Sequence, residues 1–223
     1  ELYSRLMSLH ARNATDEVIR NLKPGVTELQ MVGVAEKVIY ENGAEYEGLP
    51  MYVFSEESTR HAISRSRYRE IKKGDIVQLN LSAKIDGYSP SIGLPVIMGK
   101  LEGERRELVE FCRQMHEWTC EQIKAGVIAS DVAKRFYQKF VDNGYKDNFV
   151  YGPCHGTGMI EVEAPWMETT SDYPLEENMT FQADTFISGP TFGCRWEKGI
   201  AVKKDGYESY TDYLKKGIIE LEV

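Results

Sequence analysis

Apolar and polar positions alternate along this chain with two periods, which divide it into helical and strand-like segments. The clearest helical stretch covers residues 103–124, where apolar side chains recur at three- and four-residue steps. Another covers residues 2–22, and two more follow the turns at Gly25 and Gly126. The pattern therefore predicts four helices, two in each half of the chain.

The turns around two of these helices match across the two halves. Glycines stand 18 positions apart in each half, at Gly25 and Gly43 and again at Gly126 and Gly144. The second glycine of each pair follows Asn, which is typical of a helix C-terminus. Thr27 and Ser130 are the expected N-caps. This agreement indicates an internal duplication.

Strand-like alternation follows each predicted helix pair. Residues 72–80 (KKGDIVQLN) and 176–184 (EENMTFQAD) both place a turn before an alternating segment. Aligning the two segments makes Asp184 the counterpart of Asn80. The two residues therefore hold corresponding positions in the two halves.

The repeat predicts an α+β fold. Two helix-helix-strand-strand halves, about 1–100 and 101–223, are expected to form one pseudo-twofold domain with a shared central site. Two independent small domains are the alternative, but no Pro/Gly/Ser-rich linker separates the halves. Because the chain begins with Glu1 instead of Met, we expect it to be the C-terminal domain of a longer protein.

Composition excludes several classes of protein. A hydrophobic content of 42% over 223 residues is enough for a full core. The net charge of −8 argues against nucleic acid as a partner. The sequence contains no apolar run of about 18 residues, so it predicts no membrane-spanning helix. Four cysteines without zinc-like spacing favour a reducing cytoplasm.

Two of the four histidines stand in segments that suit a site. His155 lies in the glycine-rich stretch 151–158, where small neighbours leave room for a ligand. His61 follows a polar loop. His10 and His116 fall on helical patterns and are interpreted as surface or packing residues.

Three acidic residues are further candidates. Asp184 stands in an otherwise uncharged strand, and its pairing with Asn80 favours a functional role over that of a solvent-facing strand residue. Glu197 opens the last long strand pattern, where a simple edge charge is the alternative. Glu163, just before Ala164-Pro165, is the weakest of the three candidates.

These segments together resemble the pita-bread family, which includes methionine aminopeptidase, prolidase, Xaa-Pro aminopeptidase and creatinase. The resemblance covers essentially the whole chain and rests on the duplication and on the segments KKGDIVQLN, YGPCHGTGMIEVEAP, MTFQAD and CRWEKGIAV. It implies duplicated halves around a central antiparallel sheet. It also implies a homodimer that acts on a small molecule or a short peptide.

The metallopeptidases of this family hold two divalent metals with Asp, Asp, His, Glu and Glu. Carried over position by position, those ligands become Asn80, Ser91, His155, Asp184 and Glu197. A two-metal cluster needs bridging carboxylates, and two of the four carboxylates are missing. We therefore expect no metal cofactor. The alternative is one weakly held Mn, Co, Zn or Fe ion on His155, Asp184 and Glu197.

The chain resembles the metal-free creatinase branch most, because Asn80 is shared with it and His61 matches its acid/base histidine. Gly93 stands where creatinase has a further carboxylate, which argues against creatine as substrate. The segment YGPCHGTGMIEVEAP resembles the family's signature His-Gly-x-Gly-x-x-x-His-Glu-x-Pro, but Val162 stands in place of its second histidine.

Three functions follow as hypotheses. The first is metal-independent hydrolysis or elimination at a C–N bond, with His61 or His155 moving the proton beside Asp184 and Glu197. Asn80, Ser91 and Glu163 would contact the substrate. The second is an Xaa-Pro aminopeptidase or dipeptidase with one residual metal, and the third is a non-catalytic peptide-binding module.

Overall fold

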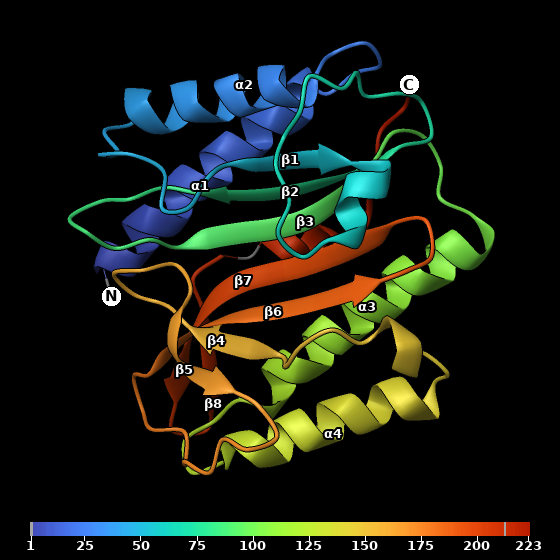
Figure 1. Cartoon of the computed structure of the whole chain (residues 1–223). Coiled ribbons are helices and arrows are strands. Elements are labelled where there is room, and N and C mark those ends of the chain that lie inside the picture. The colour runs from blue at the N-terminus through green and yellow to red at the C-terminus, as the bar shows by residue number, and fades with distance from the viewer. Residues whose placement is uncertain (1, 212) are drawn as a thin grey trace.

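A computed structural model describes residues 2–211 and 213–223, with side chains from residue 11 onward. The four predicted helices are present, and they lie along a central sheet (Figure 1). Their bounds are α1 (Leu2–Asn21), α2 (Glu28–Glu41), α3 (Gly103–Gln122) and α4 (Ala129–Asp142). Short 3-10 turns cover Glu56–Arg60, Lys146–Asn148 and Tyr213–Lys216.

The strands of the described residues form one nine-stranded sheet in the order β1-β2-β3-β7-β6-β4-β5, with β8 paired to β7 and β9 to β3. The first half supplies β1 (Tyr52–Ser55), β2 (Ile76–Ser82) and β3 (Ser91–Ile97). The second half supplies β4 (Cys154–Gly156), β5 (Glu163–Met167), β6 (Thr180–Ser188), β7 (Gly193–Lys203), β8 (Gly206–Ser209) and β9 (Ile219–Glu220). All pairings are antiparallel except β3–β9.

The two halves join where β3 pairs with β7, through Ile92 opposite Lys198 and Gly93 opposite Glu197. The sheet therefore runs without a break from one half into the other. A central antiparallel sheet with contributions from both halves confirms the predicted fold class. That residues 1–223 form a single duplicated domain stays a prediction.

Local signals set the helix bounds, with one exception. Thr27 caps α2 in a capping box, because its hydroxyl accepts from the backbone N–H of Gln30 and the Gln30 side chain accepts from Thr27 N. The prediction for Ser130 is wrong, since α4 begins after Ile128. Ser130 lies in the first turn and donates to Asp172 Oδ1 at 3.2 Å.

Strand alternation separates a helix-facing core from a polar face. On β6, Phe181, Ala183 and Ile187 belong to the apolar core under the helices. Gln182 and Asp184 point to the opposite face but are also buried, with Asp184 only 4% exposed. Asp184 is thus not a solvent-facing strand residue, because loops of both halves cover the polar face of the sheet.

None of the helices in the described part of the chain combines the length and the hydropathy that crossing a bilayer requires.

Candidate active site

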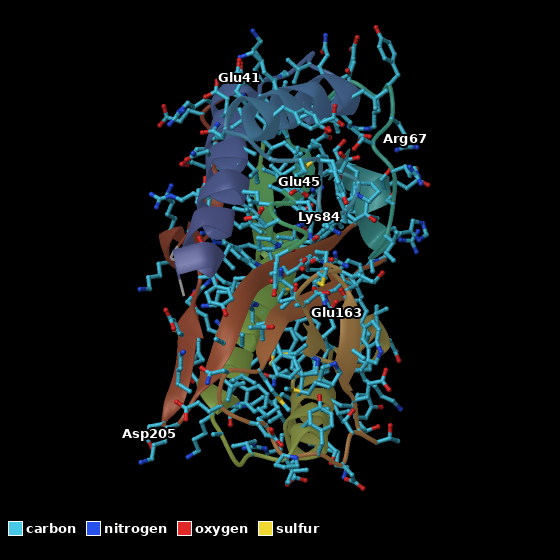
Figure 2. All side chains as sticks on the ribbon, turned by 90° about the vertical axis from the view of Figure 1, so that its left-hand side faces the viewer. Glu41, Glu45, Arg67, Lys84, Glu163 and Asp205 are labelled. Carbon is cyan, nitrogen blue, oxygen red and sulfur yellow. The ribbon has the colours of Figure 1, made fainter. Side chains whose placement is uncertain are left out.

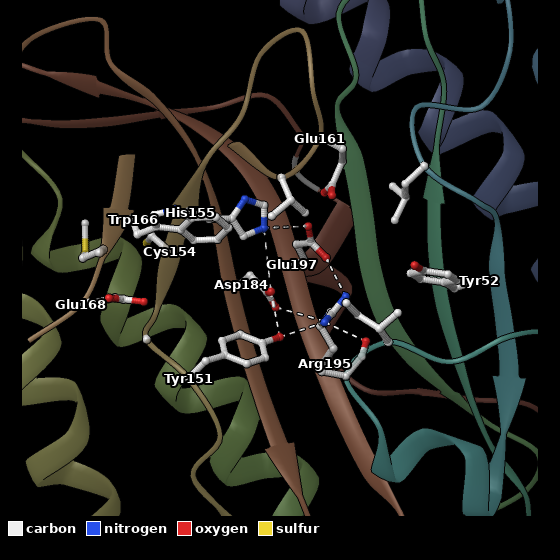
Figure 3. A pocket seen from close by; sticks show the side chains of 16 residues that line it. Tyr52, Tyr151, Cys154, His155, Glu161, Trp166, Glu168, Asp184, Arg195 and Glu197 are labelled. Carbon is white, nitrogen blue, oxygen red and sulfur yellow. Dashed lines mark hydrogen bonds and ion pairs between the residues drawn. The ribbon is translucent and has the colours of Figure 1, made fainter. Parts of the chain in front are cut away.

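A cavity of about 340 Å³ opens on the polar face of the sheet, where the two halves meet (Figure 3). Three strands of the second half place polar side chains in it: His155 from β4, Asp184 from β6, and Arg195 and Glu197 from β7. Asp184 and Glu197 are direct cross-strand partners, so the sheet register itself brings the two carboxylates together.

Arg195 is a buried cation between these two carboxylates (Figure 3). Its Nε lies 3.1 Å from Asp184 Oδ1, and its Nη1 lies 3.6 Å from Glu197 Oε2. Its Nη2 donates to the hydroxyl oxygen of Tyr151 and to the carbonyl of Ala62, each at 2.9 Å. All three guanidinium nitrogens therefore face oxygen atoms of the protein.

The two carboxylates differ in their protonation. Burial raises the pKa of Asp184 to about 6, although Arg195 and the hydroxyl that Tyr151 donates at 2.8 Å oppose the rise. Burial also opposes the charged form of Glu197, but Arg195, His155 and the hydrogen bonds from Glu161 and Asn80 together outweigh it and lower the pKa of Glu197 below its ordinary value. Glu197 is thus the carboxylate that stays ionised throughout the neutral range.

Asn80 and Ser91 both bind Glu197, on opposite carboxylate oxygens. Asn80 Nδ2 donates to Glu197 Oε2. The Ser91 hydroxyl lies 2.8 Å from Glu197 Oε1 and 2.7 Å from Glu161 Oε1, and it accepts from Gln182 Nε2 at 3.2 Å. A hydroxyl carries a single proton, so Ser91 donates to only one of the two carboxyl groups at a time.

His155 presents a free ring nitrogen to the acidic groups. Its Nδ1 donates to the carbonyl of Gly156 at 2.9 Å, which leaves Nε2 without a proton in the neutral ring. Nε2 lies 3.9 Å from both Asp184 Oδ2 and Glu197 Oε1, beyond hydrogen-bond distance. The ring is 7% exposed. A cation or a proton between these atoms would satisfy the arrangement.

Glu161 is a site residue that the sequence did not reveal. It lies in the loop between β4 and β5, is 3% exposed, and lines the cavity. Burial, together with the carboxylate of Glu197, raises the pKa of Glu161 well above its ordinary value. Glu163, two positions further along, is the acid that the sequence indicates, because it stands just before Ala164-Pro165.

Four expected site residues are not among the residues that line the cavity: Asn80 and Ser91, which bind Glu197, and also Glu163 and His61. Glu163 is half-buried at the start of β5, and its carboxylate accepts from the backbone N–H of Ile160 at 3.0 Å. His61 is exposed and lines a separate hollow together with Arg65 and Arg67. The structure therefore does not bring His61 to His155, because the chain next to it presents Ala62 and Ile63 to the cavity instead.

The remaining histidines differ from one another. His116 is buried, not on the surface, and desolvation lowers its pKa to about 3. The side chain of His10 lies outside the described residues.

The donor set of the cavity suits one divalent ion. His155, Glu161 and Glu197 offer ligand atoms that all lie within 4.8 Å of one another. Imidazole and carboxylate are ligands that Mn, Co, Zn and Fe ions accept. Glu161 stands in this group in place of the expected Asp184, whose carboxylate contacts Arg195 and Tyr151.

Comparison with known proteins identifies relatives over nearly the whole chain. A sequence model of metallopeptidase family M24 matches residues 5–204. An uncharacterised peptidase of Bacillus subtilis (strain 168) is 26% identical over 94% of this chain and 60% of its own length. The Xaa-Pro dipeptidase of Lactobacillus helveticus is 25% identical over 85% of this chain and 52% of its own length.

Solved structures show the same fold. The X-Pro aminopeptidase from Thermotoga maritima MSB8 superposes with a TM-score of 0.92 at 23% identity, over 97% of this chain and 62% of that one. The prolidase from Pyrococcus furiosus gives a TM-score of 0.89 at 22% identity, over 93% and 62%. The chain thus spans between about half and three fifths of the length of these relatives.

Proposed function

Because the chain belongs to metallopeptidase family M24, we propose that it carries the peptidase site of an enzyme that removes residues from the amino end of short peptides. Relatives named as Xaa-Pro dipeptidase and X-Pro aminopeptidase support a peptide as the substrate class. The charge and the walls of the cavity support the choice of the amino end.

The charge balance of the cavity is the observation that carries the proposal. Four carboxyl groups line it, against one guanidinium, and the nitrogens of Arg195 already face protein oxygens. Arg195 is the one Arg or Lys among the described lining residues, and its charge is already paired with Asp184 and Glu197. A negative, low-dielectric cavity favours an ammonium group over a carboxylate. A peptide is therefore expected to enter with its amino end first.

The walls of the cavity are apolar. Tyr52, Ile63, Val162 and Trp166 line it around the charged group. Ile63 and Trp166 are 75% and 46% exposed, so apolar surface also extends to the mouth of the cavity. Such a lining favours a substrate with an apolar residue near its amino end.

The residues at the base of the cavity divide the chemistry among them. His155 and Glu197, with a second carboxylate, would hold a divalent ion, and such an ion supplies Lewis acidity toward a peptide carbonyl. Asn80 and Ser91 orient Glu197 by hydrogen bonds. Arg195 and Tyr151 hold Asp184 in place.

A panel of matched peptides tests the preference for the amino end. We expect N-acetylation of an apolar Xaa-Pro peptide to lower kcat/KM by about 10- to 100-fold, since an ion-paired hydrogen bond contributes about 1.5–3 kcal/mol. Amidation of the C-terminus is expected to change kcat/KM by less than about threefold. A strong loss on amidation, or equal cleavage of the acetylated peptide, would contradict the proposal.

Metal-independent hydrolysis is the second candidate, and Arg195 is the observation in its favour. Its guanidinium already neutralises part of the charge of Asp184 and Glu197, a task that metal ions perform in the metallopeptidases. Peptidase activity measured after dialysis against a chelator separates the two candidates. Full activity in metal-free protein would support the second, and loss that Mn²⁺ or Co²⁺ restores would support the first.

Three further expectations stay proposals. The chain is proposed to act as the C-terminal domain of a longer cytoplasmic protein and to form a homodimer. Light scattering of the purified chain, which gives its molar mass in solution, tests the dimer directly.

A further inference from the structure

The position of Glu161 beside Ser91 is unexpected for a loop residue. Ser91 stands where the family resemblance expects a metal-binding Asp, so a carboxylate is missing from β3. The Glu161 carboxylate lies 2.7 Å from the Ser91 hydroxyl, next to the position at which the carboxylate of an Asp on β3 would stand. The short serine side chain leaves the space that the carboxylate of Glu161 enters from the opposite half of the molecule.

We propose that Glu161 replaces the carboxylate lost at Ser91, and that His155, Glu161 and Glu197 bind one divalent metal ion. The three residues offer ligand atoms within 4.8 Å of one another. They are 7%, 3% and 1% exposed, which shields a bound ion from bulk water. The catalytic use of the ion rests on the proposed function, but the test of metal binding does not depend on that function.

His155 is an independent observation that points to a cation. Because its Nδ1 donates to the carbonyl of Gly156, the lone pair of Nε2 faces carboxylate oxygens with no hydrogen bond to any of them. A backbone carbonyl that accepts from the other ring nitrogen is the usual support of a metal-binding histidine. The ring is thus already held in the orientation and tautomer that a metal ion needs.

The two oxygens of Glu197 explain why only one ion fits. Oε2 is occupied by the Asn80 amide and faces the Arg195 guanidinium 3.6 Å away, so a cation on that side would be repelled. Oε1 faces His155 and Ser91. One side of the carboxylate is therefore open to a metal ion, and the other side already has its positive partner.

The loop that carries Glu161 is tied to the first half of the chain. Lys84 Nζ donates to the carbonyl of Met159 at 2.8 Å, and the Ser89 backbone N–H donates to the carbonyl of Gly158 at 2.8 Å. Figure 2 shows Lys84 on the same side of the molecule as Glu163, which ends this loop. These bonds across the halves hold Glu161 toward the cavity.

Co²⁺ titration of the purified chain, followed by calorimetry and by the visible absorption of the ion, tests the proposal. We expect one Co²⁺ per wild-type chain and an affinity lower by about 100-fold in Glu161→Gln, since even outer-shell changes cost 10- to 100-fold. Glu163→Gln is the matched control, because its carboxylate lies in the same segment but outside the cavity, and it is expected to bind Co²⁺ as the wild type does.

The double variant Ser91→Asp/Glu161→Gln tests the replacement itself. It returns a carboxylate to β3 while removing the one from the loop, and we expect it to recover at least tenfold of the lost Co²⁺ affinity. Thermal unfolding in chelator, which should be similar for all variants, excludes a folding defect. Unchanged binding by Glu161→Gln, two ions per chain, or no Co²⁺ binding by the wild type would overturn the proposal. Because binding is measured without peptide, failure of the peptidase assay alone would leave this result standing.

Discussion

Replacing Arg195 with Met removes the single buried cation of the site at nearly constant side-chain length. Asp184 and Glu197, 4% and 1% exposed, would then face each other across adjacent strands without a positive partner. Tyr151 and the carbonyl of Ala62 would each lose a hydrogen bond as well. The free energy of unfolding of Arg195→Met is therefore expected to fall.

The size of the loss follows from the geometry. At an effective dielectric constant of about 20, unit charges at the observed 3.1 and 3.6 Å attract by ~5 kcal/mol each. Much of that attraction offsets the cost of taking the ions out of water, and removing one partner of a buried ion pair costs about 3–5 kcal/mol. We expect Arg195→Met to lose about 3–5 kcal/mol of the free energy of unfolding.

Urea unfolding at pH 7 in the presence of a chelator, followed by tryptophan fluorescence and circular dichroism, measures this loss. Arg195→Lys keeps the charge but not the planar fork, so a smaller loss is expected. The double variant Asp184→Asn/Arg195→Met is expected to be more stable than Arg195→Met, because one unpaired charge is gone. A loss below about 1 kcal/mol for Arg195→Met would refute the electrostatic reasoning.

Three other predictions concern pH, close packing and helix capping. The pKa of buried His116 is lowered to about 3, so the unfolded chain takes up a proton first as the pH falls below about 6.5. As the pH falls from 6.5 to 4, the free energy of unfolding of His116→Leu relative to wild type should therefore rise by about 1.4 kcal/mol per pH unit. A difference between the two proteins that stays constant with pH in urea titrations would contradict this. In Gly93→Ala the added Cβ would lie 2.5 Å from Asn80 Oδ1, so we expect the free energy of unfolding to fall by about 1–3 kcal/mol. The control Gly33→Ala has open space around its added Cβ in α2 and should raise the free energy of unfolding by about 0.5–1 kcal/mol. Equal shifts of the melting temperature in the two variants would exclude the clash. Thr27→Ala removes the capping box of α2 and should lower the free energy of unfolding, measured by urea titration, by about 1 kcal/mol. An unchanged free energy of unfolding would show that the cap is not needed.

Local patterns predicted the four helices of this fold closely. The apolar period over residues 103–124 corresponds to α3, Gly103–Gln122, because helix periodicity depends on neighbours only three or four residues apart. Thr27 was identified as an N-cap for the same reason. Ser130 was not a cap, since a partner from elsewhere in the chain, Asp172, binds its hydroxyl.

Parts of the site could also be predicted, where strands carry them. The internal repeat made Asp184 the counterpart of Asn80. Their strands, β6 and β2, are separated in the sheet by β7 and β3, but both side chains are buried on its covered polar face. The family resemblance identified His155 and Glu197, which line the cavity. The positions of these residues could be predicted from the sequence because a regular strand fixes the face of every side chain.

The sequence by itself determined the duplication, the helices and the strand residues that face the cavity. Only the tertiary structure decided that Glu161 enters the cavity, that His61 stays outside it, and that Arg195 is committed to its neighbours. The first two residues lie in loops, where no period fixes the direction of a side chain. Contacts made by distant parts of the chain, such as the bond from Lys84 to Met159, set that direction instead.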